Sequence, residues 1–428
     1  MPQTETETAL TLAARVEERT AGPGRVLVLP TPVQSVVALR GSFLAHPDFA
    51  AGDELVQALT VGLLDKGTRR RDRFAVAELL ENRGAELAFV SEGLRVGFHG
   101  RALREDLPLV LELLAEQLRD PLLDAGEFEK ARVQYRASLQ RAMENTRSQA
   151  SAALSRRLYR PAHPNFTPSI EESLDRLDRL TLADVRAYHE RHFGADDLVL
   201  ALAGDVDAGE AAPWLEDAFG GWAAHGAEAA FDADAAPQTP GRAEVPMPGK
   251  RNVDVHLGHA LEVRRQDDDY LPLYLACHIL GGNFSGRLMS RVRDELGLTY
   301  GIYAVLDGVT TEHSGHWHLG VTLSHERVDE GLAATLAEVR RFVEDGPTPA
   351  EVDDARTNLV GSFKVGLATT GGLAATLHLN AVRRFPTRYL DDYPAEIGAQ
   401  TQEDVHGAAR RHFHPERLHT ALAGTLEA

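Results

Sequence analysis

The amino-acid sequence predicts an α+β fold of two tandem homologous domains. Three observations support this prediction: a segment that recurs after 220 residues, strand-like and helix-like runs mixed in each half, and a stretch without periodicity between the halves. A period of that length is too long for a solenoid, whose units span about 20 to 50 residues. Because 43% of the 428 residues are hydrophobic, each half can bury a core of its own.

The recurring segment is the strongest of these observations. LTLADVRAYHERHFGADDLVLALAGDVD begins at Leu180, and QTQEDVHGAARRHFHPERLHTALAGTLE begins at Gln400, 220 residues later. Each copy is typical of a helix, a short loop and an apolar strand that ends at glycine. A fainter match pairs EFEKARVQYRASLQ, from Glu127, with EVDDARTNLVGSFK, from Glu351. The two halves should therefore superpose.

The boundary between the halves is a segment rich in alanine, aspartate, proline and glycine, AAHGAEAAFDADAAPQTPGRAEVP. Such a composition indicates an interdomain linker. Strand-like runs flank it, RVLVLPT in the first half and NVDVHLGHAL in the second. We therefore expect domains at residues 1–224 and 245–428, with a linker at about 225–244.

Within the first half, strands and helices come in runs, which favours helices layered on a sheet. SVVALRGSFL and LRVGFHGRAL have the alternating or β-branched character of strands. FAVAELLENRGA predicts a helix of about three turns that ends at Gly84. Two further helices should be separated at Pro121, and the second, from Asp124, is charged and should be largely exposed.

Charge and cysteine content restrict the function classes. The chain has 45 Lys and Arg against 64 Asp and Glu, a formal net charge of −19, which argues against a nucleic-acid binder. This charge would attract cationic peptides over long range, or it serves solubility alone. The single cysteine, Cys277, excludes an intrachain disulfide and fits a reducing compartment. With no apolar run near the roughly 18 residues of a membrane span and no signal-peptide pattern, we expect a soluble cytoplasmic protein without a membrane partner.

The order of the segments resembles the pitrilysin/insulinase-type metallopeptidases, the inverzincins with H-x-x-E-H. The matching segments are GSFLAHPDFAAGDELVQALTVGLLDKGT, AELLENRGAELAFVSEGLRVGFHGRAL, EDLPLVLELLAEQLRDPLLDAGEFEKAR, LALAGDVD and LGGNFSGRLMSRVRDELGLTYGIYA, of which the last is the most specific. The resemblance covers nearly the whole chain. It implies two domains, each a mainly antiparallel sheet covered by helices, that face each other across a chamber.

In active members of that family, the helix before the Lys-Gly-Thr turn carries H-x-x-E-H. The two histidines bind zinc, and the glutamate activates a zinc-bound water. Alignment on this turn places three residues at the motif positions, namely Ala58, Val61 and Gly62. The third zinc ligand, a glutamate further along the chain, falls near Ala137 or Ser138. The resemblance therefore implies a degenerate zinc motif, with no metal and no cofactor in this chain. The helix itself should remain as core, through Leu55, Leu59, Leu63 and Leu64.

The second half keeps two residues that the family uses. An arginine and a tyrosine seven residues later point into the chamber in active members, and here they correspond to Arg293 and Tyr300. The arginine offers a fork of donors to peptide carbonyls or a carboxylate, and the tyrosine hydroxyl can donate to a developing oxyanion. The alternative is a solvated arginine and a half-buried strand tyrosine. Tyr303 is the weaker candidate, because an odd offset along a strand places it on the opposite face from Tyr300.

Other candidate sites are weaker. His316 and His318 in HWHLGV share a strand face and could chelate a metal, but with no carboxylate or cysteine nearby they are expected to be surface residues. His189 and His192 in YHERHF are expected to pack at a helix end. The glycine-rich LGGNFSGR lacks a phosphate-binding pattern and resembles the family's loop along the substrate path.

The pattern of loss and retention predicts a non-catalytic, zinc-less subunit of a heteromeric peptidase. A zinc-bearing, family-related partner would supply H-x-x-E-H, and this chain would supply Arg293 and Tyr300 to bind peptide substrates and stabilise the transition state. Three alternatives stay open: a structural or assembly subunit like the scaffold proteins of respiratory complexes, an active enzyme with another metal site, and, for assembly, a homodimer of this chain.

Overall fold

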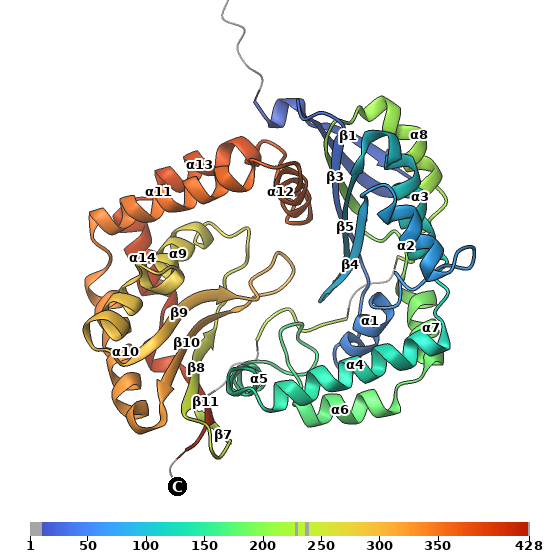
Figure 1. Ribbon diagram of the computed structural model, residues 1–428. Coiled ribbons are helices and arrows are strands. Elements are labelled where there is room, and N and C mark those ends of the chain that lie inside the picture. Colours follow the sequence, from blue (N-terminus) through green and yellow to red (C-terminus); the bar gives the residue numbers. More distant parts are fainter. Residues whose placement is uncertain (1–10, 227–229, 236–238, 427–428) are drawn as a thin grey trace, which may run out of the picture.

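The computed structural model describes residues 11–226, 230–235 and 239–426, which form two mixed sheets covered by helices (Figure 1). The first sheet has the order β1-β2-β6-β3-β5-β4. Its strands are β1 (Glu17–Ala21), β2 (Gly24–Pro30), β3 (Val36–Leu44), β4 (Glu86–Glu92), β5 (Arg95–Leu103) and β6 (Val199–Gly204). The second sheet has the order β7-β11-β8-β10-β9. Its strands are β7 (Arg242–Pro246), β8 (Asn252–Ala260), β9 (Thr299–Asp307), β10 (His316–Ser324) and β11 (His419–Gly424). The predicted α+β class is confirmed.

The helices follow the same division of the chain. Those of the first half are α1 (Asp53–Val61), α2 (Arg73–Glu81), α3 (Leu107–Arg119), α4 (Ala125–Met143), α5 (Thr146–Leu158), α6 (Ile170–Arg179), α7 (Leu182–His192) and α8 (Ala208–Phe219). Those of the second half are α9 (Tyr270–Cys277), α10 (Val328–Asp345), α11 (Pro349–Gly366), α12 (Thr370–Val382), α13 (Tyr389–Ala399) and α14 (Gln402–His412). Among the described helices, each is too short or too polar to span a bilayer.

Both sheets follow one plan. Apart from the edge strand β1, the order β2-β6-β3-β5-β4 of the first sheet corresponds strand by strand to β7-β11-β8-β10-β9. The single parallel pair has the same place in each, β2 with β6 and β7 with β11, and the other pairs are antiparallel. The recurring segment forms α7 and β6 in one half and α14 and β11 in the other. The strand order thus supports the two similar halves that the repeat predicts.

Local sequence explains several of these boundaries. α3 ends at Arg119 and α4 begins at Ala125, on either side of Pro121, as predicted. Gly84, which ends the turn after α2, has a φ of 59°, a left-handed conformation that glycine adopts without strain. α1 is shorter than expected and ends at Val61. β7 begins at Arg242, inside the range 225–244 predicted as a linker.

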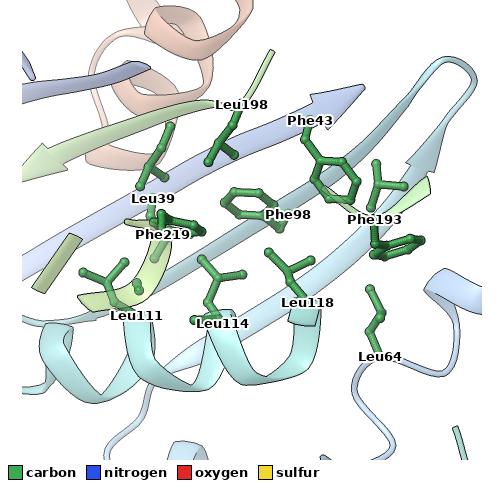
Figure 2. Packing of buried hydrophobic residues seen from close by; sticks show 14 of the residues in the cluster. Leu39, Phe43, Leu64, Phe98, Leu111, Leu114, Leu118, Phe193, Leu198 and Phe219 are labelled. Carbon is green, nitrogen blue, oxygen red and sulfur yellow. The ribbon is translucent and has the colours of Figure 1, made fainter. Parts of the chain in front are cut away.

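The core of the first half lies between its sheet and the helices outside it. Leu111, Leu114 and Leu118 on one face of α3 point toward Leu39 and Phe98 of the sheet (Figure 2). α1 packs against α7 and the edge strand β4. Its predicted apolar residues and those of the following turn are buried, namely Leu55, Leu59, Leu63 and Leu64. The α1 helix is therefore part of the core, as expected.

Each half also contributes one helix to the other half's sheet, which the sequence did not predict. α12 packs against β2, β3 and β6 of the first sheet, and α5 packs against β7, β8 and β11 of the second (Figure 1). Leu377 of α12 lies in one apolar cluster with Leu27 and Ala201, and Leu154 of α5 lies in another with Ala421. We call the sheet face that receives this helix the inner face. The exchange ties the two halves together through their inner faces.

Candidate functional site

The predicted zinc-motif positions lie at one pocket of the first half. Ala58 of α1, Gly62 directly after α1 and Ser138 of α4 line a pocket of about 420 Å³. Of the two candidate positions for the third zinc ligand, Ser138 is the one that lines this pocket. Val61, at the position of the catalytic glutamate, is buried in the core of the half. Two helices distant in sequence therefore meet where the alignment places a metal site.

The side chains around this pocket do not fit a zinc ion. Among the motif positions, the Ser138 hydroxyl is the one side-chain group with a polar atom. Glu127 also lines the pocket, but its carboxylate accepts a hydrogen bond from Lys130 Nζ at 2.9 Å and lies 3.4 Å from the Arg73 guanidinium. The bond from Lys130, followed by the charge of Arg73, lowers the pKa of Glu127. Lys66 also lines the pocket, and the positive charges of Lys66, Arg73 and Lys130 would repel a divalent metal ion.

Arg293 and Tyr300, predicted to act together, lie next to each other in the second half. Arg293 is on the π-helix η4 (Met289–Glu295), and Tyr300 is at the start of β9. The Arg293 guanidinium carbon lies 5.5 Å from the centre of the Tyr300 ring and 4.6 Å from the centre of the Phe284 ring. Both distances fit cation–π contacts. Tyr300 is 88% exposed, so its hydroxyl is accessible to a ligand.

Two local irregularities lie between Arg293 and the part of β9 that follows Tyr300. After the end of η4, the amide of Leu298 donates to the carbonyl of Val292 at 3.0 Å and Gly297 has a φ of 60°, the left-handed glycine cap with which helices often end. In β9, Thr299 pairs with Leu323 and Ile302 pairs with Val321, so β9 holds one more residue than β10 over this stretch. β-bulges re-aim side chains and are over-represented next to active sites.

The bulge overturns the argument that set Tyr303 apart from Tyr300. Thr299 and Ile302 are three residues apart but pair with residues two apart, so the alternation of faces resets between them. Tyr303 is half-buried, and its ring centre lies 5.5 Å from that of His318. The prediction that an odd offset separates the two tyrosines is therefore wrong, although Tyr303 is also the less accessible of the two.

Sequence reasoning missed Phe284 as a member of this group. The LGGNFSGR loop was noted for its glycines, but Phe284 within it is 70% exposed and stacks on Arg293. Arg293 thus contacts the rings of both Phe284 and Tyr300, and the Asp294 carboxylate lies 3.2 Å from its Nη1. The signal available in the sequence was an aromatic residue within a glycine-rich loop.

The other histidines fall into two groups. His189 is at a helix end, with Nε2 2.8 Å from the Leu118 carbonyl oxygen, in line with the expected packing role. His192 stacks on Tyr188. The expectation that His316 and His318 are surface residues is wrong, because they are only 7% and 5% exposed. A carboxylate, that of Asp307, also lies beside them, which the sequence order did not reveal.

Family models match two parts of the chain. "Insulinase (Peptidase family M16)" matches residues 62–166, and "Peptidase M16 inactive domain" matches residues 179–359. Together they cover about two thirds of the sequence. The chain belongs to the M16 (insulinase) peptidase family, so the resemblance is confirmed at the level of the family. The first match begins at Gly62, and the preceding motif positions Ala58 and Val61 lie outside it.

Individual relatives include both proteases and a non-peptidase. The chain is 24% identical to an uncharacterized zinc protease of Streptomyces coelicolor over 409 residues, 92% of this chain and 86% of that protein. It is 23% identical to a non-peptidase homolog of Helicobacter pylori over 325 residues, 74% of each protein. Among solved structures, a peptidase M16 inactive domain from Pseudomonas fluorescens has a TM-score of 0.85 and 25% identity, covering 96% of this chain and 98% of that one.

Proposed function

We propose that this chain is the non-catalytic subunit of a heteromeric M16 peptidase, lacks the family's catalytic zinc, and acts in peptide hydrolysis only with a zinc-bearing, family-related partner. The observation that carries the proposal is the contrast between two sites. The motif positions Ala58 and Gly62 line a pocket whose described side chains do not suit zinc, whereas Arg293 and Tyr300 lie together and accessible in the second half. A chain that had lost every role in proteolysis would have no need of the second arrangement.

Two of these similar proteins are in line with a loss of independent peptidase activity. One is a non-peptidase homolog, and a similar solved structure is an inactive domain of the family. The cations Lys66, Arg73 and Lys130 around the degenerate pocket favour an anionic group there over a metal ion. The catalytic zinc would therefore enter the assembly with the partner.

Arg293 and Tyr300 would act on a peptide held between the subunits. The planar guanidinium of Arg293 can donate two parallel hydrogen bonds to a peptide carbonyl or terminal carboxylate. Phe284 and Tyr300 limit the rotation of this side chain by stacking on it. The exposed Tyr300 hydroxyl can donate to the oxyanion that forms when a carbonyl is attacked. Binding and transition-state stabilisation would thus come from this chain, and water activation from the partner.

Co-expression tests the proposal. The chain is expressed alone and together with an H-x-x-E-H chain of the same family from the same organism, and cleavage of a fluorogenic peptide is measured. We expect cleavage by the complex only, and none when the motif glutamate of the partner is changed to glutamine. Cleavage by this chain alone would contradict the division of roles.

A second candidate is a structural or assembly subunit, and the non-peptidase homolog favours it. In that case, the chain would bind its partner, but Arg293→Ala and Tyr300→Phe would leave cleavage unchanged. Light scattering of the chain alone would also show whether it forms a homodimer, the assembly that competes with a heteromeric complex.

A further inference from the structure

The inner face of the second sheet carries a group of metal-ligand side chains away from the family's zinc position. His316 and His318 are two residues apart on β10 and therefore share a face. Asp307 on β9 is the direct cross-strand partner of His316. That face is the inner one, because a Cβ on Gly258, the partner of His318 on β8, would lie 3.2 Å from Leu154 of α5. Regular strand pairing thus places three ligands in one cluster.

The distances within this cluster suit a metal ion. One ligand atom from each of Asp307, His316 and His318 lies within 4.8 Å of the other two. Asp307 Oδ2 is 3.5 Å from His318 Nδ1 and 4.0 Å from His316 Nε2. Ligands of a tetrahedral zinc ion, at about 2.0–2.1 Å from the metal, lie roughly 3.3 Å apart. Small side-chain rotations therefore bring the three atoms to coordination distance.

One nitrogen of the cluster lacks a partner. Nδ1 of His318 is buried and has no hydrogen-bond partner within the part of the chain that the structure describes. It faces the Asp307 carboxylate at 3.5 Å. A buried polar atom left unpaired costs free energy, and most such atoms in proteins are satisfied by a group, a water or an ion. A metal ion between His318 and Asp307 would satisfy it.

Neighbouring side chains orient both imidazoles. Nε2 of His318 is 2.8 Å from Nδ1 of His256, and Nδ1 of His316 is 3.0 Å from the hydroxyl of Tyr159. A proton on Nε2 of His318 would be donated to His256, and a proton on Nδ1 of His316 would be donated to Tyr159. These tautomers leave Nδ1 of His318 and Nε2 of His316 as free lone pairs beside Asp307. Metal-binding histidines are usually oriented through their other ring nitrogen in this way.

The carboxylate side of the cluster is open to solvent. The side chain of Asp307 is 56% exposed, which gives a metal ion and a water access to the cluster.

We propose that Asp307, His316 and His318 bind a divalent transition-metal ion, with zinc the best match. Two imidazoles and one carboxylate are a zinc donor set, whereas Mg²⁺ and Ca²⁺ prefer oxygen ligands throughout. Three protein ligands leave a coordination position for water or an external ligand, as in catalytic rather than structural zinc sites. The proposal is independent of the proposed function, because the cluster lies on the second sheet and not at Ala58 and Gly62.

Metal titration of the intact chain tests the site. The protein is stripped with a chelator, and its zinc affinity is measured by competition with a chromophoric chelator. We expect one tight site per chain, lost in His318→Gln and in Asp307→Asn. His256→Gln should weaken binding by about 10–100-fold, since it removes only the partner of a ligand. His325→Gln is the matched control, a partly exposed histidine of the same half, and should bind as the wild type does.

Thermal unfolding of the same variants distinguishes a loss of zinc binding from a loss of the fold. Zinc should raise the unfolding temperature of the wild type and of His325→Gln, because a ligand that binds the folded state stabilises it. It should not raise that of Asp307→Asn, whose exposed side chain keeps its size and whose fold should be unaffected. Wild-type protein without a tight site, or an Asp307→Asn variant that binds and responds like the wild type, would overturn the proposal.

Discussion

The two sheets share one strand order, yet their inner faces differ in chemistry. On the first sheet, apolar side chains such as Leu27, Val199 and Ala201 meet Leu377 of α12. On the second sheet, the same face carries His256, His316, His318 and Tyr303, and α5 adds apolar contacts near β11. The outer faces of both sheets remain apolar cores. The outer cores of the two halves thus have the same apolar character, while the inner faces differ in theirs.

The exchanged helices make the strongest test of this comparison. Leu377→Ala in α12 and Leu154→Ala in α5 each remove a fully buried side chain, and each should lower the free energy of unfolding by about 2–5 kcal/mol. Leu379→Ala on the same helix as Leu377 is the control. Its side chain is 42% exposed, and the change should cost less than about 0.5 kcal/mol. Urea unfolding measures all three. Equal costs for Leu377→Ala and Leu379→Ala would show that α12 is not held by the first sheet's inner face.

Tyr300 tests whether the second half acts in catalysis. In the reconstituted complex, Tyr300→Phe removes one hydroxyl donor and should lower turnover by about 10²–10³, or roughly 3–4 kcal/mol. Arg293→Ala should instead raise KM, with a smaller effect on kcat. Tyr303→Phe is the control and should leave turnover unchanged, because this ring packs against His318. If Tyr300→Phe and Arg293→Ala both cleave like the wild type, the structural role becomes the better explanation.

Much of the fold could be predicted because the recurring segment is local. The match of Leu180 with Gln400 identified two helices and two strands without any knowledge of long-range contacts. The exchange of α5 and α12 could not be predicted in this way. Their apolar faces are visible in the sequence, but periodicity does not reveal which sheet a helix covers.

The candidate sites could likewise be predicted only where they do not depend on long-range strand contacts. Ala58 and Ser138 were placed near one another by family resemblance, and they line one pocket. The proximity of Asp307 to His318 depends on the register between β9 and β10, which a single sequence does not define. The β-bulge before Ile302 could not be predicted for the same reason, and Gly301 was the residue that indicated it.

A buried histidine of α12, His378, contacts the inner face of the first sheet and makes stability depend on pH. The Ser42 hydroxyl accepts a hydrogen bond from Arg95 Nε at 2.8 Å and therefore donates to Nε2 of His378, also at 2.8 Å. Burial, together with the charges of Arg95 and Arg40, lowers the pKa of His378 to about 3. Its neutral form is thus favoured in the folded state, so its contribution is complete above the unfolded pKa of about 6.5 and is lost as the pH falls toward 3.

The expected size of this effect follows from linkage. Between pH 7 and pH 5, protonation of His378 in the unfolded chain alone should lower the free energy of unfolding by about 2 kcal/mol. A His378→Gln variant cannot titrate, so it should lose about 2 kcal/mol less than the wild type over this range. Urea unfolding at the two pH values measures the difference. Parallel losses in both proteins would show that His378 is protonated equally in the folded and unfolded states.

The smallest effect concerns the helix caps that the two halves share. The Thr181 hydroxyl accepts from the amide of Asp184 at 3.3 Å, and the Asp184 carboxylate accepts from the amide of Thr181 at 2.8 Å. At the same place in the other half, Thr401 and Asp404 make the equivalent pair of bonds at 3.1 and 2.9 Å. Thr181→Ala and Thr401→Ala should therefore each cost about 1 kcal/mol of stability, while the matching changes to serine keep the hydroxyl and should cost less. Urea unfolding compares the pair directly. Equal losses of stability would mean that the two caps contribute the same free energy as well as sharing one geometry. A loss in one half alone would mean that the cap of the other half keeps its hydrogen bonds but does not stabilise its helix.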